Sequence, residues 1–287
     1  MLPQKDLQHF ILTRFNILLW RQDKGGSPVR TTKWLDHRFS LFERFCLPSV
    51  KGQTCQDFEW IVLVDSKTPE PYMQRLAAYQ HDCPQMVLVY VEPKNGYLFA
   101  QIFRTEVLKR LQAKRVITSY LDNDDALNVN YVQDLQQRVT SLSDGTFIYY
   151  ADGYQYYTDY QYLMQIRYRR NHFVSVVESG NPSTLKTIYG YGSHYFIHKI
   201  KGAKIEYVKA LPMWCEIIHD KNVSNDAYFF NAKMVRDKTV LQRDFSLNET
   251  IHYGISLYLF RFLPHYVKTF IRRSRNYLWR ITQKKVR

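Results

Sequence analysis

The chain has 287 residues, of which 45% are hydrophobic and 16% aromatic, and its formal net charge is +14. This composition excludes a disordered polypeptide and suffices for one α/β domain with an added subdomain. The four cysteines show no C-x-x-C pairing, so they indicate neither a zinc site nor a disulfide framework. The first residues include Lys5 and Asp6 and no long apolar run, so we expect no signal peptide.

The positive charge is concentrated near the C-terminus. Residues 253–287 contain nine Lys or Arg and no Asp or Glu, whereas the first 252 residues have a net charge of only +5. Basicity is therefore mainly a property of the tail. This indicates an anionic surface as the partner of the tail and argues against a body that wraps nucleic acid.

The first half of the chain alternates between predicted strands and predicted helices. Apolar, β-rich runs predict four strands, over residues 9–18, 58–65, 86–92 and 115–121. Apolar residues at helical spacing predict three helices between them, over residues 32–47, 69–80 and 97–112. This alternation predicts an α/β fold with a doubly wound, mostly parallel sheet.

The second half is richer in predicted strands. A helix over residues 130–142 precedes a β-rich stretch over residues 146–179, in which Asp152–Gly153 is predicted to form the turn of a hairpin. The sequence shows no internal repeat or low-complexity linker. We therefore treat residues 1–252 as one folded domain and residues 253–287 as a basic, amphipathic, helical tail.

A concentration of negative charge follows the fourth predicted strand. Asp122, Asp124 and Asp125 lie within four residues, and like charges this close repel and raise each other's pKa. Ligands of open α/β sheets bind beyond the carboxyl ends of the strands, where this cluster, Arg14 and Asp65 are all predicted to lie. A cation bound to the carboxylates would offset their repulsion.

The surrounding residues restrict the kind of cation. An EF-hand calcium loop starting at Asp122 would need Gly where Leu127 stands and Glu where Gln133 stands. One aspartate could cap the following helix, but a cap alone does not account for three carboxylates. A hard divalent cation, Mg²⁺ or Mn²⁺, bound by one or two carboxylates and shared with substrate phosphates, fits this pattern better.

The segment LDNDDALN (Leu121–Asn128) resembles the D-x-D region of GT-A nucleotide-sugar glycosyltransferases. FAQIFRTEVLKRL followed by RVITSYLDNDD is similar to the helix and strand that precede this region in those enzymes. More narrowly, TRFNI, CLPSVKGQT, LDNDDALN, TIYG and NVSN together resemble a rhamnosyltransferase family of bacterial polysaccharide biosynthesis. The resemblance covers roughly residues 9–250.

The resemblance implies a GT-A-like fold and a glycosyltransferase. The enzyme would transfer a sugar, with rhamnose as a candidate, from a nucleotide diphosphate sugar to a saccharide acceptor. Residues 1 to about 130 would bind the donor, and residues from about 131 to 252 would bind the acceptor. Inversion at the sugar is implied by the family alone, and a metal ion would act as a Lewis acid on the leaving diphosphate.

The resemblance also implies the metal ligands. Asp122 and Asp124 would hold the ion, and Asp122 would in addition contact the nucleotide sugar. His219 would be a further ligand supplied by a C-terminal loop, although a lone histidine is more often structural. Asp125 is expected to cap the next helix or to orient Asp124.

Three further residues are predicted to bind the nucleotide sugar. The resemblance places Asp65 at the nucleobase or ribose, and its alternative role is that of a turn residue. Arg104 matches the family's helix arginine, with a helix-face salt bridge as the alternative. Arg14 follows the first strand and is suited to a bidentate contact with a diphosphate or a flat contact with a base, with a surface ion pair as the alternative.

An inverting transferase needs a general base that takes the proton of the acceptor hydroxyl. Such a residue should follow the D-x-D motif, at the rim of the second half. Glu178, which ends FVSVVES before a polar loop, is the first candidate for this catalytic role. Asp152, Glu216 and Asp226 are the alternatives.

Two other functions are compatible with parts of the sequence. A pI of about 9.5 and many aromatic residues also suit a polyanion- or RNA-binding protein, but the acidic cluster lies where a ligand should bind. A metal-dependent nucleotidyltransferase would share the sheet and the carboxylates, yet RQDKGGSP (Arg21–Pro28) does not match a phosphate-binding loop. We therefore expect a nucleotide-sugar donor and no nucleic acid partner.

The tail is predicted to lie on an anionic membrane surface, on the cytoplasmic face of the plasma membrane. Arg261, Pro264 and Lys268 interrupt its most apolar part, so it is too polar for a spanning helix of about 20 residues. An interfacial position suits its mixture of apolar and basic residues. A lipid-linked saccharide acceptor would explain such a peripheral location, and a tail that packs on the domain is the alternative.

Removal of residues 253–287 should therefore abolish binding to anionic membranes. Each basic residue near such a surface contributes about 1 kcal/mol, so even a few acting together give salt-sensitive binding. Co-sedimentation with liposomes that contain anionic lipid would compare the full chain with a chain that ends at His252. Equal binding of the two chains would contradict the membrane prediction.

Overall fold

The computed structural model describes residues 5–19, 31–219 and 232–257, together with a few residues beyond them. Asp226 and the NVSN motif (residues 222–225) lie outside the described residues, as does most of the predicted tail. In the part of the chain that is described, no helix combines the length and the apolar character needed to cross a membrane.

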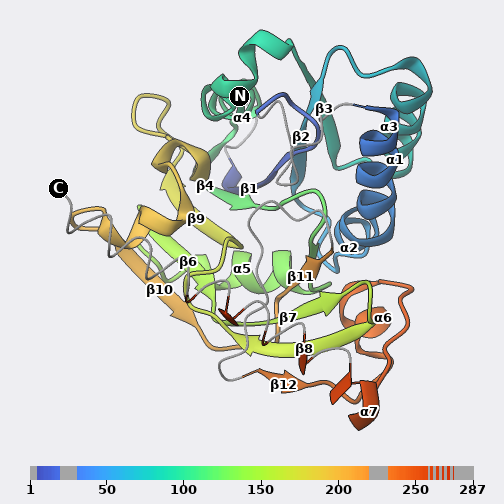
Figure 1. The fold of residues 1–287 in the computed structure, drawn as a ribbon. Coiled ribbons are helices and arrows are strands. Elements are labelled where there is room, and N and C mark those ends of the chain that lie inside the picture. Colours follow the sequence, from blue (N-terminus) through green and yellow to red (C-terminus); the bar gives the residue numbers. More distant parts are fainter. Residues whose placement is uncertain are drawn as a thin grey trace, which may run out of the picture.

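A seven-stranded sheet forms the centre of the molecule (Figure 1). Its strands are β1 (Lys5–Arg14), β2 (Glu59–Asp65), β3 (Met86–Val91), β4 (Ala113–Tyr120), β6 (Thr146–Tyr150), β9 (Val174–Ser179) and β10 (Lys204–Val208). They lie in the order β10-β6-β9-β4-β1-β2-β3. Strand β9 is antiparallel to both neighbours, and the other pairs are parallel. The predicted mostly parallel sheet is therefore confirmed.

Helices cover both faces of this sheet. One layer contains α1 (Thr32–Leu41), η1 (Phe42–Cys46), α2 (Leu47–Lys51), α3 (Glu70–Asp82) and α5 (Tyr131–Val139), and the other contains η2 (Pro93–Leu98), α4 (Phe99–Arg110), η3 (Ile188–Tyr191) and η4 (His194–Lys199). Successive residues of a strand face opposite sides. Ile11 of β1 therefore packs in the layer of Phe39 and Trp60, whereas Phe10 packs in the layer of Phe103. The sheet is doubly wound, as predicted.

The connections change face once among the first four strands. The helices that join β1 to β2 and β2 to β3 lie on one face, and α4, which joins β3 to β4, lies on the other (Figure 1). The strand order therefore reverses between β1 and β4, and open α/β sheets bind ligands in the crevice at such a point. Arg14 ends β1 and Tyr120 ends β4, so the acidic cluster lies beside this crevice.

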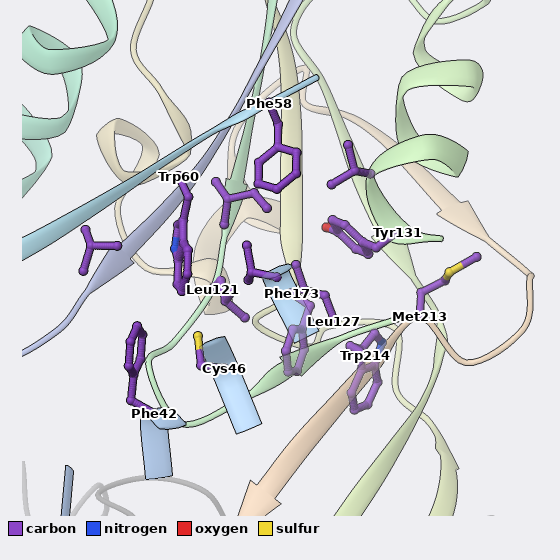
Figure 2. Packing of buried hydrophobic residues seen from close by; sticks show 14 of the residues in the cluster. Phe42, Cys46, Phe58, Trp60, Leu121, Leu127, Tyr131, Phe173, Met213 and Trp214 are labelled. Atoms are coloured by element: carbon purple, nitrogen blue, oxygen red, sulfur yellow. The ribbon is translucent and has the colours of Figure 1, made fainter. Parts of the chain in front are cut away.

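Large aromatic side chains fill the first layer of the core (Figure 2). Phe42 stacks on Trp60 with the ring centroids 5.5 Å apart, and the indole N–H of Trp60 donates to Thr13 Oγ1 at 2.9 Å. Phe173 stacks on Trp214 with the centroids 4.9 Å apart. These contacts join β1, β2 and η1 on one side and join β11 to the segment before β9 on the other.

A second, five-stranded sheet contains the other strands of the β-rich second half. Its strands are β5 (Ala126–Leu127), β7 (Asp152–Tyr157), β8 (Tyr162–Arg167), β11 (Trp214–Ile218) and β12 (Lys233–Met234), in the order β12-β8-β7-β11-β5. A separate apolar cluster packs this sheet against α6 (Val240–Phe245). The short helix α7 (Ile255–Leu257) follows it along the chain.

Asp152–Gly153 is not the turn of the hairpin that β7 and β8 form, which corrects the prediction. The turn lies at residues 158–161, where Gln161 has a φ of 51°. Gly153 lies inside β7, and a Cβ built on it would come within 2.1 Å of Trp214 Cδ2. The glycine is therefore needed for the close approach of the indole to the strand.

Gly153→Ala should lower the free energy of unfolding by about 2–3 kcal/mol, because an added methyl group in a close-packed core forces its neighbours apart. Gly254→Ala is the matched control, since the nearest atom to its Cβ would be Ser256 Oγ at 3.9 Å. The control should change the free energy of unfolding by less than about 0.5 kcal/mol. Chemical denaturation measures both values, and equal midpoints for the two variants would contradict the prediction.

Candidate active site

The residues after β4 form a turn that presents the acidic cluster at the carboxyl end of the sheet. The backbone N–H of Asp125 donates to the carbonyl of Asp122 at 3.3 Å, and the side-chain amide of Asn123 donates to the carbonyl of Phe15. Strand β5, which begins at Ala126, then pairs with β11. The acidic turn (residues 122–125) is thus tied both to the end of β1 and to the second sheet.

Asp122 faces the end of β1. Its Oδ1 accepts a hydrogen bond from the Tyr120 hydroxyl at 2.9 Å and lies 3.5 Å from Arg14 Nη2. The same Nη2 donates to the Tyr120 hydroxyl at 2.6 Å. The side chains of Arg14 and Asp122 are 23% and 32% exposed, so the pair is partly accessible to solvent. The structure therefore brings these two predicted binding residues together.

The guanidinium of Arg14 lies among three aromatic rings. Its Cζ is 5.0 Å from the ring centroid of Phe99, 5.5 Å from that of Tyr120 and 5.2 Å from that of Tyr189. Burial alone would lower the pKa of Arg14, but the two tyrosines and Asp122 raise it above its ordinary value. Among the described residues, its buried Nε has no hydrogen-bond partner. The side chain thus stays charged, and it is 23% exposed.

Asp124 lies between two basic side chains from different elements. Its Oδ2 accepts a hydrogen bond from Arg38 Nη1 of α1 at 3.0 Å and lies 3.1 Å from His219 Nε2, just after β11. Arg38 also donates to Asn123 Oδ1 at 2.9 Å. Burial alone would raise the pKa of Asp124, but Arg38 and His219 lower it below its usual range. Asp124 is therefore ionised, and it adjoins the other predicted metal ligand, His219.

Asp125 does not cap the next helix, which corrects that part of the prediction. Helix α5 begins at Tyr131 and has Asn130 as its cap residue. Asp125 is fully buried, its Oδ2 lies 2.6 Å from His172 Nε2, and its Oδ1 accepts the N–H of Ile217 at 2.8 Å. Burial alone would lower the pKa of His172, but the hydrogen bond to Asp125 raises it to about 9. Asp125 thus fastens the acidic turn to β11 and to His172.

Two groups of ligand atoms in the described residues could hold a cation here. Asp122, Asp125 and His172 each offer a ligand atom within 4.8 Å of the others. Asp124 Oδ2 and His219 Nε2 lie 3.1 Å apart. Neighbouring ligands of an octahedral ion with bonds of about 2.1 Å are about 3 Å apart. Donor sets rich in carboxylates suit Mg²⁺ and Mn²⁺, so the side chains fit a hard divalent cation.

Glu216, one of the alternative bases, borders the acidic turn. It lies on β11, is 9% exposed, and its Oε2 accepts a hydrogen bond from Gln155 Nε2 at 2.6 Å. Burial raises the pKa of Glu216, His172 opposes this effect, and two aspartates of the acidic turn add to it. A carboxylate with a raised pKa is suited to accept a proton near neutral pH.

Glu178, the first candidate base, lies farther back in the sheet. It is in register with Val116 of β4, whereas the acidic turn follows Tyr120. Its two carboxylate oxygens accept the backbone N–H groups of Lys186 and Thr187, each at 3.0 Å. The structure does not bring Glu178 to the acidic turn, and its position gives no support to the role of base.

Two more predicted residues are engaged in local contacts. Asp152, an alternative base, forms a bidentate pair with Arg167 at 2.7 and 3.0 Å. Arg104 donates from Nε to the carbonyl of Leu185 at 2.8 Å and from Nη2 to that of Pro182 at 2.7 Å. These bonds hold a loop in place of the helix-face salt bridge that was the alternative role of Arg104, and its contact with the nucleotide sugar stays a prediction.

Asp65 lies at the carboxyl end of β2, next to the end of β1. Its backbone N–H donates to Asn16 Oδ1 at 2.9 Å, and its own Oδ1 accepts the N–H of Lys67 at 2.8 Å. Asn16 also donates to Thr68 Oγ1 at 2.8 Å. These bonds show the turn that was the alternative role of Asp65, and the contact with a nucleotide stays a prediction.

Four residues that were not predicted complete the site. They are Arg38, Tyr120, His172 and Tyr189. Arg38 lies on an ordinary helix face, and its Cζ is 5.3 Å from the Trp34 ring centroid, so no local pattern distinguishes it. Tyr189 belongs to the TIYG segment, and this segment was the one signal in the sequence that pointed to any of the four.

A comparison with models of protein families identifies the family of this chain. A family model described as "Putative rhamnosyl transferase" matches residues 28–229. The chain belongs to this family. No curated protein matches the sequence.

Some solved structures are similar to this chain at low sequence identity. TarS 1-349 of S. aureus has 11% identity and a TM-score of 0.41, and the match covers 73% of this chain and 60% of that one. The same fragment in complex with UDP has 10% identity and a TM-score of 0.37, with 74% and 60% covered. A putative nucleotide-diphospho-sugar transferase from Desulfovibrio desulfuricans G20 has 8% identity and a TM-score of 0.35, with 73% and 82% covered. The chain spans 37% of the longer TarS structure. Family membership rests on the sequence match and not on these likenesses.

Asp125→Asn should lower the free energy of unfolding by about 3 kcal/mol, because it breaks a fully buried pair with His172. Asp122→Asn makes the same chemical change three residues away. It should change the free energy of unfolding by less than about 1 kcal/mol, because the side chain of Asp122 is 32% exposed and solvent weakens its ion pair with Arg14. Chemical denaturation compares the two variants, and equal losses would contradict the assigned roles.

Proposed function

We propose that this protein is a metal-dependent glycosyltransferase of bacterial surface polysaccharide synthesis. It would move a sugar, with rhamnose as the first candidate, from a nucleotide diphosphate sugar to a saccharide or lipid-linked saccharide acceptor. Membership of the family supports the transfer of a sugar. The main structural support is the acidic turn at the carboxyl ends of β1 and β4, where Asp122 adjoins Arg14 and Asp124 adjoins His219.

The proposed metal ligands are Asp122, Asp124 and His219, and the proposed ion is Mn²⁺ or Mg²⁺. When bound, such an ion would neutralise the diphosphate as its bond to the sugar breaks. The ligand atoms of Asp124 and His219 are in hydrogen-bond contact at 3.1 Å, and a shared ion would replace this contact. Arg14 and Arg38 offset part of the negative charge of the turn, so the ligands are held ready before the donor binds.

Arg14 is the proposed diphosphate-binding residue of the protein itself. A guanidinium can form two parallel hydrogen bonds with phosphate oxygens. The rings of Phe99, Tyr120 and Tyr189 restrict its movement, so little conformational entropy is lost when the anion binds. Asp65, at the end of the neighbouring strand, is proposed to contact the nucleoside.

Glu216 takes the place of Glu178 as the proposed general base. In an inverting transfer, the acceptor oxygen attacks the anomeric carbon of the sugar while the bond from that carbon to the diphosphate oxygen breaks. The hydroxyl proton of the acceptor passes to the carboxylate of Glu216. Its raised pKa and its place on β11, beside the acidic turn, support this role.

A peripheral position on the cytoplasmic face of the membrane is part of the proposal. Several large apolar side chains described in the tail are exposed, among them Ile255, Leu259, Phe260, Val267, Phe270 and Ile271. Together with the basic residues of the tail, they form the kind of segment that binds in the headgroup region of a bilayer. A lipid-linked saccharide would be presented at that surface.

Asp124→Ala should abolish turnover without unfolding the protein, because it removes a proposed metal ligand and not a core side chain. His219→Ala should weaken Mn²⁺ binding, since it removes another proposed ligand. The measurement is release of nucleoside diphosphate from a panel of nucleotide sugars, with and without Mn²⁺. If Asp124→Ala keeps the turnover of the wild type, the proposed metal site is wrong.

Glu216→Gln should lower kcat by about 100-fold or more, as expected for a lost general base, with little change in the KM of the donor. Asp152→Asn is the comparison, because Asp152 pairs with Arg167 and should affect stability more than kcat. Steady-state kinetics with the best donor of the panel separates the two. If Glu216→Gln keeps the kcat of the wild type, a residue other than Glu216 is the general base.

A further inference from the structure

Two residues that the sequence predicted to act on the substrate hold the same loop. Residues 180–187 connect β9 to η3. Glu178 accepts the N–H groups of Lys186 and Thr187 at the end of this loop, each at 3.0 Å. Arg104 donates to two carbonyls earlier in the loop, at 2.7 and 2.8 Å. A buried anion and a cation thus bind opposite kinds of backbone group in one segment.

The loop ends in a strained residue. Thr187 has a φ of 66° and a ψ of 162°, and β-branched residues rarely adopt a positive φ. Such a conformation persists only where its surroundings impose it. The N–H of Thr187 is held by Glu178, and the N–H of the next residue, Ile188, donates to Thr118 Oγ1 at 2.8 Å. One of these hydrogen bonds lies at the strained residue itself, and the other lies at the residue that follows it.

The strained residue determines the direction in which η3 leaves the loop. Two residues later, the ring of Tyr189 stacks on Phe103 with the centroids 4.8 Å apart and the planes at 7°. It also packs against Tyr120, with the centroids 4.8 Å apart, and its centroid is 5.2 Å from Arg14 Cζ. Tyr189 therefore forms one wall of the pocket in which Arg14 is held.

We propose that Glu178 is a positioning residue: it holds the strained turn at Thr187 and thereby places Tyr189 against Arg14, the anion-binding residue of the proposed function. The inference rests on that function, because it assigns Arg14 to the diphosphate. Glu178 touches neither the acidic turn nor Arg14. Its effect on the substrate passes through the loop and through Tyr189.

A carboxylate is suited to this task for a chemical reason. A buried Glu is unfavourable unless its oxygens are hydrogen bonded, and Glu178 is only 5% exposed. Its Oε1 and Oε2 each accept a backbone N–H, and Oε1 also accepts the Tyr191 hydroxyl at 2.9 Å. The side-chain amide of Gln has only one acceptor oxygen. Its NH₂ group would face one of these N–H or O–H donors, with which it cannot form a hydrogen bond. Glu178→Gln therefore releases the turn with almost no change in volume.

The test measures the binding of pyrophosphate to the full chain in the presence of Mg²⁺ by calorimetry. Pyrophosphate is the part shared by all nucleotide diphosphate donors. Glu178→Gln should weaken its binding about tenfold, the effect of one or two lost hydrogen bonds to a charged group. Glu206→Gln is the matched control, because Glu206 is an exposed residue of β10, and it should bind as the wild type does.

Thr187→Gly tests the role of strain, since glycine adopts a positive φ without cost. It should leave pyrophosphate binding unchanged by itself. Added to Glu178→Gln, it should restore most of the lost affinity for pyrophosphate, because the turn then forms even without the hydrogen bonds to Glu178. Tyr189→Ala, which leaves Glu178 and the loop intact, should weaken binding as much as Glu178→Gln does.

The kinetic prediction separates a positioning residue from a base. Glu178→Gln should raise the KM of the donor about tenfold and change kcat little, whereas loss of a base lowers kcat. Unchanged pyrophosphate affinity in Glu178→Gln, or a fall in kcat at constant KM, would overturn the inference and leave the proposed function standing. A wild-type protein that binds neither pyrophosphate nor any nucleotide sugar would instead refute the proposed function and with it this inference.

Discussion

The structure depends on the neutralisation of three carboxylates in one short turn. Each aspartate has its own basic partner from a different part of the chain: Arg14 for Asp122, Arg38 and His219 for Asp124, and His172 for Asp125. Without these partners, three like charges so close together, two of them buried, would be strongly unfavourable. The turn therefore brings β1, α1 and the segments around β9 and β11 to one place.

The same electrostatic arrangement gives the three aspartates different roles. Asp125 is fully buried and serves the fold, because it fastens the turn to β11 through the N–H of Ile217. Asp122 is partly exposed beside the end of β1, and Asp124 is largely buried between Arg38 and His219. A turn that is rigid on its buried side and charged on its open side can present ligand atoms without much reorganisation when a cation and a diphosphate bind.

The direction of one strand explains why Glu178 lies away from the acidic turn. Residues at the ends of parallel strands share one edge of the sheet, and this reasoning correctly placed Arg14, Asp65 and the acidic cluster together. Strand β9 is antiparallel to β4, so its C-terminal end, which bears Glu178, lies toward the opposite edge. Glu216, on β11 of the second sheet, lies next to the acidic turn because β11 pairs with β5.

Local patterns in the sequence were sufficient for much of the fold and part of the site. Apolar periodicity identified the four parallel strands and their helices, and the charged residues at the strand ends marked the ligand-binding edge. A local pattern also misled, since Asp152–Gly153 has the composition of a tight turn but lies inside β7. There the glycine leaves room for Trp214, a residue 61 positions away along the chain.

The sequence by itself therefore determined what depends on neighbours along the chain: the alternation of strands and helices, the acidic turn and the positions of Arg14 and Asp65. Only the tertiary structure decided which basic residue pairs with which aspartate, and that Arg104 and Glu178 hold a loop. These contacts join residues from separate elements, such as Arg38 of α1 and Asp124 after β4. The order and direction of strands bring such residues together, and no periodicity within a single element encodes that order or direction.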